Sequence, residues 1–291
     1  MKKILIICIL AALSICACDR VITDYDAAIA NAEGELGLGQ TREALDHYRA
    51  IARGLKTDPR WAGIMLRIAE IESNMMRDRA AADEALSDVI ERAPLTEAGR
   101  IAREARARER VRQKDYQGAI EDYNALIKHF PEGDHAMRYR IDLAGVYLTS
   151  KDFRQSRIEV KPLVEGEGVP PEIREKAVFL AAESFFLEGQ ARKAAGYYEW
   201  LIRDFPNSPL LAEAKLHLAT CIEELGYLGI AREVTRDAAK DYPNKGVIDA
   251  RLKSIDERGT KPAKQMKGEA KAGDAEATNA PKKVYKEEPL N

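Results

Sequence analysis

Small residues recur along the chain at a nearly constant interval. Each tends to be followed by a bulky or β-branched residue four positions later, an apolar residue seven later and a proline twelve later, as Tyr123, Leu126 and Pro131 follow Ala119. Residues four and seven apart share one face of a helix, and proline ends a helix because it lacks a backbone N–H. The pattern therefore predicts one helix per interval. The small residues, at steps of 38, 37, 37, 38 and 37, are Ala44, Ala82, Ala119, Ser156, Ala194 and Ala231.

A second apolar pattern precedes each small residue. Leu143, Ala144 and Tyr147 lie thirteen, twelve and nine positions before Ser156, and the next two units repeat this spacing. In three units a glycine occupies the position five before the small residue, where a short turn between antiparallel helices favours it. Each unit is therefore predicted to be a hairpin of two helices. The three glycines are Gly39, Gly189 and Gly226.

The small, aromatic and proline positions of these hairpins resemble those of the tetratricopeptide repeat. The resemblance covers roughly residues 25–243, closely in the last four units and more loosely in the first two, where Glu35, Glu70 and Ser73 occupy places that the pattern would keep apolar. It implies an all-α fold, a right-handed superhelical solenoid of about six antiparallel hairpins, the first two degenerate. Phe179 and Phe186 belong to the better-matching part of the array.

The pattern changes after Pro243. Val247, Ile248, Leu252 and Ile255 predict one more amphipathic helix over residues 244–258, which would cap the solenoid. From residue 259 to residue 291 the chain is rich in Lys, Ala, Gly, Glu and Pro, with few apolar residues, so we expect a disordered tail.

The N-terminus carries Lys2 and Lys3 followed by an uncharged apolar run over residues 4–17. Fourteen helical residues would reach only about 21 Å, which is short of a hydrocarbon core of about 30 Å. We therefore expect residues 1–17 to be a cleaved export signal. The segment before Cys18 resembles the lipobox of bacterial lipoproteins, with Ile15 and Ala17 in fitting places and Cys16 as a departure at the variable one.

The lipobox resemblance implies that Cys18 is acylated and that residues 18–24 form a short tether to the membrane. An ordinary soluble secretory signal is the alternative. An outer-membrane anchor is favoured, although Asp19 resembles the inner-membrane retention signal of enteric bacteria. After signal cleavage and acylation the body keeps only Cys221, so no disulfide framework is expected within it.

The charge and the polar residues exclude several functions. The chain has 46 basic and 48 acidic residues, without the basic excess that a nucleic-acid partner requires. The four histidines stand at no metal-ligand spacing to one another or to Cys221, and the glycines near residue 37 lack the Lys and Ser/Thr of a phosphate loop. We therefore expect no cofactor, no metal, no small-molecule substrate and no enzymatic activity. Cys221 is read as a packed small side chain, with a reactive thiol as the alternative.

One stripe on the first helix of each hairpin is the candidate binding surface. In the repeat family that stripe lines a concave groove, and here several of its members are large and apolar. Two arginines from the basic run over residues 100–112 add a candidate patch for an acidic partner, with a solvated helix surface as the alternative. Packing between repeats is the alternative for the apolar members. The candidate groove residues are Arg108, Arg112, Ile141, Leu148, Phe179, Phe186 and Leu216.

Aromatic–proline junctions end three of the hairpins, at residues 130–131, 205–206 and 242–243. In its combination of such junctions with a lipobox, the chain resembles the outer-membrane β-barrel assembly lipoproteins of the BamD/YfiO type. It also resembles the periplasmic repeat protein that accompanies the Tol-Pal system. The resemblance implies a membrane-anchored periplasmic scaffold that binds other envelope proteins or peptides, in envelope or outer-membrane protein assembly. A role in cell-wall or division machinery is the alternative, and a lipid-anchored enzyme or ligand binder is the rival from another class.

Overall fold

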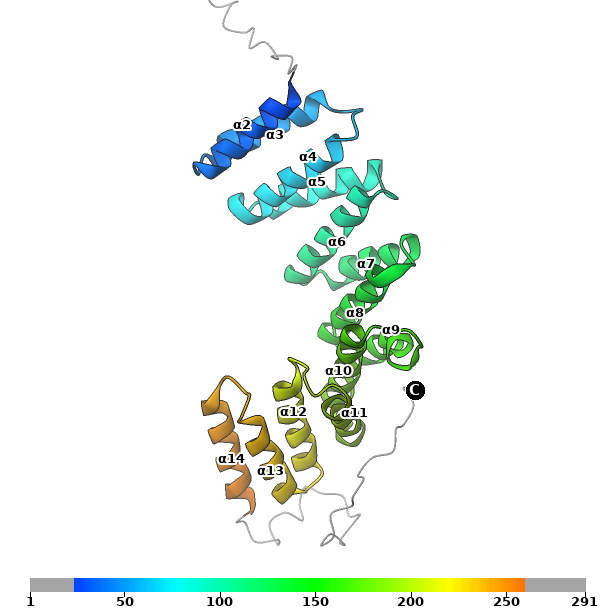
Figure 1. Cartoon of the computed structure of the whole chain (residues 1–291), viewed down its shortest axis with the longest axis vertical. Coiled ribbons are helices and arrows are strands. Elements are labelled where there is room, and N and C mark those ends of the chain that lie inside the picture. The colour runs from blue at the N-terminus through cyan, green and yellow to red at the C-terminus, as the bar shows by residue number, and fades with distance from the viewer. Residues whose placement is uncertain (1–23, 260–291) are drawn as a thin grey trace, which may run out of the picture. The chain divides into compact units, whose positions relative to one another are not determined.

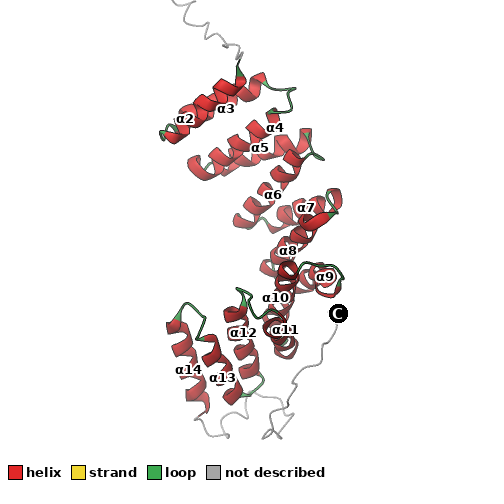
Figure 2. Ribbon diagram, viewed as in Figure 1, coloured by secondary structure: helices red, strands yellow, loops and turns green. Residues whose placement is uncertain are grey.

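The computed structural model describes residues 24–259, and in this part of the chain helices joined by short loops are the only regular secondary structure (Figure 2). It contains thirteen α-helices and one π-helical segment, and most successive helices pack against each other. The predicted all-α class is confirmed. The expected signal peptide, the lipidation at Cys18, almost all of the tether and the tail after residue 259 lie outside the described residues. None of the described helices is long and apolar enough to cross a membrane.

The chain divides into two compact units, with the boundary between Arg106 and Ala107 inside one helix (Figure 1). We call residues 24–106 unit 1 and residues 107–259 unit 2. The helices of unit 1 are α2 (Tyr25–Gly37), α3 (Thr41–Gly54), α4 (Trp61–Ile71), η1 (Glu72–Met76), α5 (Arg79–Arg92) and the first part of α6 (Glu97–Arg112). Those of unit 2 are the rest of α6, α7 (Tyr116–His129), α8 (Gly133–Thr149), α9 (Phe153–Glu165), α10 (Pro171–Leu187), α11 (Ala191–Asp204), α12 (Leu211–Glu224), α13 (Leu228–Ala238) and α14 (Lys245–Gly259).

The repeated small residues are all buried inside the hairpins. All six are at most 1 % exposed, and the tyrosine four positions later is buried beside three of them. A larger side chain at such a position would push the two helices apart, so the size of these residues sets the spacing within each hairpin. Proline follows the last helical residue by two positions in α5, α7 and α11, as the sequence pattern indicates.

The turn inside each hairpin has a left-handed residue, but only three of the six are glycines. The position five before the small residue has φ of 77°, 78° and 91° at the three glycines, and φ of 59°, 63° and 66° at Arg77, Lys114 and Lys151. At each of these three basic residues an aspartate follows directly, and its side chain accepts a hydrogen bond from the first turn of the next helix. The aspartate cap adds stability of about 1 kcal/mol, which offsets the strain of a left-handed non-glycine residue.

Candidate functional site

A cavity of about 450 Å³ opens on unit 2 along the first helices of three successive hairpins. Helices α6, α8 and α10 supply most of its wall, so it follows the stripe that the repeat pattern predicts. Its surface is largely apolar because Ile141, Phe179 and Leu180 line it. These side chains are half-buried, since they also pack on the adjoining core. The lining residues are Arg108, Val111, Tyr123, Ile141, Asp142, Gly145, Val146, Thr149, Lys176, Phe179, Leu180 and Leu210.

Three of the candidate groove residues meet at this cavity. Arg108 comes from α6, Ile141 from α8 and Phe179 from α10, and all three line it. Exposed Lys176 adds a second positive charge, and Asp142 adds one negative charge. The result is an apolar floor with charged groups at the rim, which is suited to hold an apolar side chain flanked by polar ones.

The other candidate residues are not among the cavity's lining. Arg112 is exposed, and its Nε lies 2.8 Å from the carboxylate of Glu109 on its own helix. Leu148 is half-buried on α8. Phe186 stacks on the imidazole of His217, with ring centroids 4.9 Å apart.

The placement of Leu216 in the groove is wrong. Its side chain is only 8 % exposed and packs with Ala238 of α13 and Ile248 of α14. The reason is that the last hairpin is followed by a further helix, and Ile248 from that helix covers the side of α12 on which Leu216 lies. In this hairpin the stripe has become part of the core.

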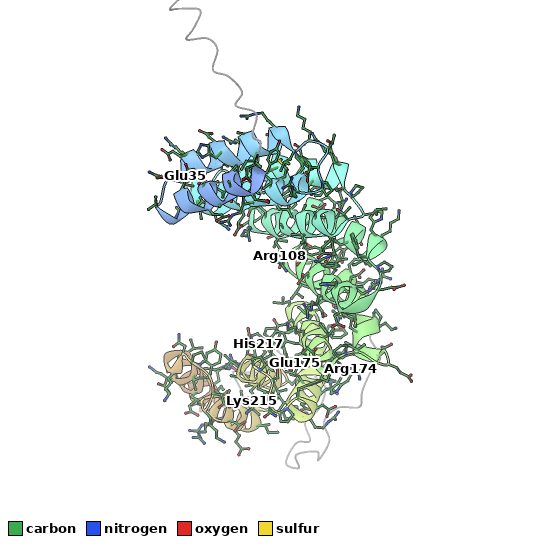
Figure 3. All side chains as sticks on the ribbon, turned by 45° about the horizontal axis from the view of Figure 1, so that its top comes forward. Glu35, Arg108, Arg174, Glu175, Lys215 and His217 are labelled. Atoms are coloured by element: carbon green, nitrogen blue, oxygen red, sulfur yellow. The ribbon has the colours of Figure 1, made fainter. Side chains whose placement is uncertain are left out.

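A polar cluster extends the groove face from α10 to α12. The hydroxyl of buried Tyr198 donates to the carboxylate of Glu183, and the Nδ1 of His217 lies 2.5 Å from the same carboxylate. Burial raises the pKa of Tyr198, and the neighbouring charge of Glu183 raises it further. The phenol therefore stays protonated and acts as a fixed hydrogen-bond donor. Arg108 and His217, from the two ends of this face of unit 2, are labelled in Figure 3.

Unit 1 contains a cluster of the same design. The Tyr48 hydroxyl donates to Glu33 over 2.5 Å, and the guanidinium of Arg67 donates to the same carboxylate over 2.8 Å. Hydrogen bonds from Arg67 and then from Tyr48 lower the pKa of Glu33. Burial raises the pKa of Tyr48 to about 12.

The two clusters reveal a longer period in the sequence. Glu33, Arg108 and Glu183 lie at successive steps of 75 positions. The same step separates the tyrosines Tyr48, Tyr123 and Tyr198, and the residues of the following helix Arg67, Asp142 and His217. The middle set of Arg108, Tyr123 and Asp142 comes together at the cavity. Sequence reasoning missed this period because the hairpin interval of about 37 residues dominates. The signal was available four positions after the small residues, where tyrosine alternates with a smaller side chain: Tyr48, Leu86, Tyr123, Val160, Tyr198 and Thr235.

In the part of the chain that the structure describes, no three His, Cys, Asp or Glu side chains are placed to hold a metal ion. The only cysteine of that part, Cys221, is buried, and burial raises the pKa of its thiol to about 12.

Comparison with known proteins places the fold. Residues 176–208, which cover most of α10 and all of α11, match the family model of the tetratricopeptide repeat. No curated protein sequence matches the chain. The chain is similar in structure to a tetratricopeptide repeat protein from Parabacteroides merdae, with 14 % identity, a TM-score of 0.53, and coverage of 79 % of this chain and 98 % of that one.

Two further solved structures share the arrangement of helices. One is YrrB, described as a TPR protein with an unusual peptide-binding site, with 13 % identity, a TM-score of 0.51, and coverage of 69 % and 96 %. The other is pilF of Pseudomonas aeruginosa, with 18 % identity, a TM-score of 0.50, and coverage of 76 % and 92 %. At these identities the likeness concerns the fold. The chain thus carries a tetratricopeptide repeat at residues 176–208 and has the all-α fold of tetratricopeptide-repeat proteins.

Proposed function

We propose that this chain is a membrane-anchored periplasmic scaffold of a bacterial cell envelope, which binds other envelope proteins or peptides through the groove face of unit 2. The observation that carries the proposal is the cavity shared by α6, α8 and α10. Its half-buried apolar side chains provide an anchor pocket, and Arg108, Asp142 and Lys176 provide polar contacts at the rim. Such a combination concentrates binding energy in a few buried contacts and leaves specificity to the charges.

The repeat family supports a binding role over a catalytic one. Tetratricopeptide-repeat proteins are in general protein-binding scaffolds, and the matching family model is not that of an enzyme. The polar cluster of Tyr198, Glu183 and His217 is bonded within itself and holds the side chains of α10 and α12 in place beside the cavity. The proposal therefore includes no reaction and no cofactor.

The proposed location rests on the N-terminal sequence. The lipobox-like segment ending at Cys18 supports a lipid anchor, with the outer membrane favoured and the inner membrane left possible by Asp19. The resemblance to BamD/YfiO-type lipoproteins supports a role in outer-membrane protein assembly. The resemblance to the Tol-Pal-associated repeat protein supports the second candidate, a role in cell-wall or division machinery.

Site-specific photo-crosslinking in living cells tests the groove. Thr149 lines the cavity and is exposed, so a benzoylphenylalanine in its place should capture the partner without disturbing the core. The matched control is the same substitution at Lys128, an exposed residue of α7 that does not line the cavity. Barrel-assembly subunits captured at Thr149 alone would support the first role, and Tol-Pal components would support the second. Equal capture at both positions, or none at Thr149, would remove the groove from the proposal.

A separate measurement tests the anchor. Wild-type chain grown with labelled palmitate should take up label and fractionate with membranes, and Cys18→Ser should do neither, because acylation and cleavage both depend on that thiol. Wild-type protein that is cut elsewhere and carries no label would contradict the lipoprotein part of the proposal.

A further inference from the structure

Unit 1 has a second cavity, of about 320 Å³, that is separate in sequence from the groove of unit 2. Helix α4 packs against both α3 and α5, and the cavity opens between these two helices. Its floor is apolar and partly made of small side chains: Ala52 of α3, Trp61 and Met65 of α4, and Ala85 of α5. Because α3 and α5 are the second helices of their hairpins, this is not the surface formed by the first helices.

The two walls of the cavity carry opposite charges. Arg49, Arg53 and Lys56 form a basic row along α3 and the turn after it, at spacings of four and three residues. Glu84 and Asp88 form an acidic row along α5, at a spacing of four. Residues at these spacings share one face of a helix.

Arg49 is the only member of the two rows that forms an ion pair with another described residue. The members without such a partner among the described residues are Arg53, Lys56, Glu84 and Asp88. Arg49 donates over 2.5 Å to Glu72, which is 2 % exposed, and burial raises the pKa of that carboxyl despite the pair. Arg92, at the end of the α5 wall, lies over the ring of Trp61 at 4.4 Å. Among the described residues, no ion pair joins the α3 wall to the α5 wall.

We propose that this cavity binds an amphipathic helix of a partner protein, with acidic residues along the edge beside α3 and basic residues along the edge beside α5. The partner's apolar stripe would lie on the floor at Ala52, Met65 and Ala85. A helix brings its own backbone hydrogen bonds, whereas an extended segment would leave its backbone groups unpaired over this apolar floor. Charges spaced by one helical turn on the partner match the spacing of the two rows.

The opposite walls also select against other ligands. A uniformly anionic surface, such as a phosphatidylglycerol membrane, would gain from Arg53 and Lys56 but be repelled by Glu84 and Asp88. A uniformly basic helix would meet the reverse conflict. Only an occupant with both signs on opposite edges satisfies both rows at once.

Three helical peptides of about 20 residues with one Leu stripe test the proposal. The first carries Glu on one edge of the stripe and Lys on the other, the second Glu on both edges, and the third Lys on both. Binding to the purified full chain in detergent is followed by fluorescence anisotropy, with empty micelles as background. We expect the two-signed peptide to bind most tightly, by about tenfold over each of the others.

A charge reversal in the basic wall should switch this preference. Arg53→Glu puts a negative charge beside Lys56 and cancels the unpaired positive charge of this wall. The two-signed peptide should therefore bind about tenfold more weakly and the all-Lys peptide more tightly. Arg42→Glu is the matched control, because Arg42 is an exposed residue of the same helix that does not line the cavity. A gain for the all-Lys peptide cannot come from misfolding.

Four results would overturn the proposal. The first is equal binding of all three peptides to the wild-type chain, and the second is no binding up to the order of 1 mM. The third is an equal effect of Arg42→Glu and Arg53→Glu. The fourth is binding to phosphatidylglycerol vesicles, but not to phosphatidylcholine vesicles, that Arg53→Glu abolishes, since that result would assign the basic row to a lipid surface. None of these results bears on the groove of unit 2.

Discussion

Unit 1 and unit 2 each hold a buried tyrosine that donates to a glutamate, but the two clusters are completed by different side chains. In unit 1 the third member is Arg67, and in unit 2 it is His217. The tyrosine rings are equally buried, at 1 % exposure for Tyr48 and 0 % for Tyr198. The carboxylates differ, because the side chain of Glu33 is 46 % exposed and that of Glu183 is 13 % exposed.

This difference separates the role of the ring from the role of the polar groups. The ring fills the same place in both hairpins, so it belongs to the scaffold. The polar groups in unit 1 form a solvated ion pair, whose net contribution to stability is small. In unit 2 the imidazole of His217 stacks on Phe186 and the Glu183 side chain is mostly buried, so a lost hydrogen-bond partner is replaced less readily by water. The same positions therefore form a surface ion pair in one unit and a partly buried hydrogen-bonded cluster in the other.

The largest effect is expected from removing either ring. Tyr48→Ala and Tyr198→Ala should each lower the free energy of unfolding by about 3 to 5 kcal/mol, because each leaves a cavity between two helices. Thermal and urea unfolding followed by circular dichroism measure both losses. A loss below about 1 kcal/mol at either position would show that the ring is not part of that unit's core.

Removing only the hydroxyl should distinguish the clusters. Tyr198→Phe should cost about 1 to 3 kcal/mol, because it leaves the Glu183 carboxylate short of a donor in a partly buried place. Tyr48→Phe should cost about 0.5 to 1 kcal/mol, because Arg67 and water still satisfy Glu33. Each variant is the control for the other in the same unfolding assay. Equal losses would mean that the difference in exposure has no energetic consequence.

Much of this arrangement followed from the sequence. The six small residues are all buried, since a constant interval of small side chains is what close helix packing requires. The stripe computed from helical periodicity led to Arg108, Ile141 and Phe179, which share one cavity. These features depend on local periodicity, and a single sequence records local periodicity well.

Local periodicity does not record features that depend on contacts with neighbouring helices. Leu216 satisfies the stripe pattern, but the helix that follows the last hairpin buries it. The turns at Lys114 and Lys151 lack the glycine signal, because an aspartate cap on the next helix compensates for the left-handed residue. The polar clusters join residues 34 positions apart through a tyrosine from the helix between them, and no period within one hairpin encodes that contact.

Salt should affect the two clusters differently, with a smaller effect than the hydroxyl deletions. Arg67→Gln should cost about 0.5 kcal/mol at low ionic strength and almost nothing near 1 M salt, because the exposed pair with Glu33 is screened. The loss caused by His217→Gln should change little with salt, since it comes from the stack on Phe186 and a partly buried hydrogen bond. The measurement is the unfolding free energy of each variant against wild type at both salt concentrations. A salt-dependent loss at His217 as large as that at Arg67 would contradict the assignment.

The smallest perturbation of the two clusters is read from the labelling rate of the Cys221 thiol. Burial, followed by the charges of Glu224 and Glu183, raises its pKa to about 12. At pH 8 the folded thiol should therefore react with a disulfide reagent only after local opening, whereas the unfolded thiol, with an ordinary pKa, reacts at once. A form of the chain that begins at residue 19 contains no other cysteine, so its labelling rate reports this site alone. Tyr198→Phe should speed labelling by about 5-fold to 150-fold, which corresponds to a loss of about 1 to 3 kcal/mol in the opening free energy, and Tyr48→Phe should leave the rate unchanged. Acceleration by both variants would mean that the two units open together, and the clusters could then no longer be treated as independent parts of the molecule.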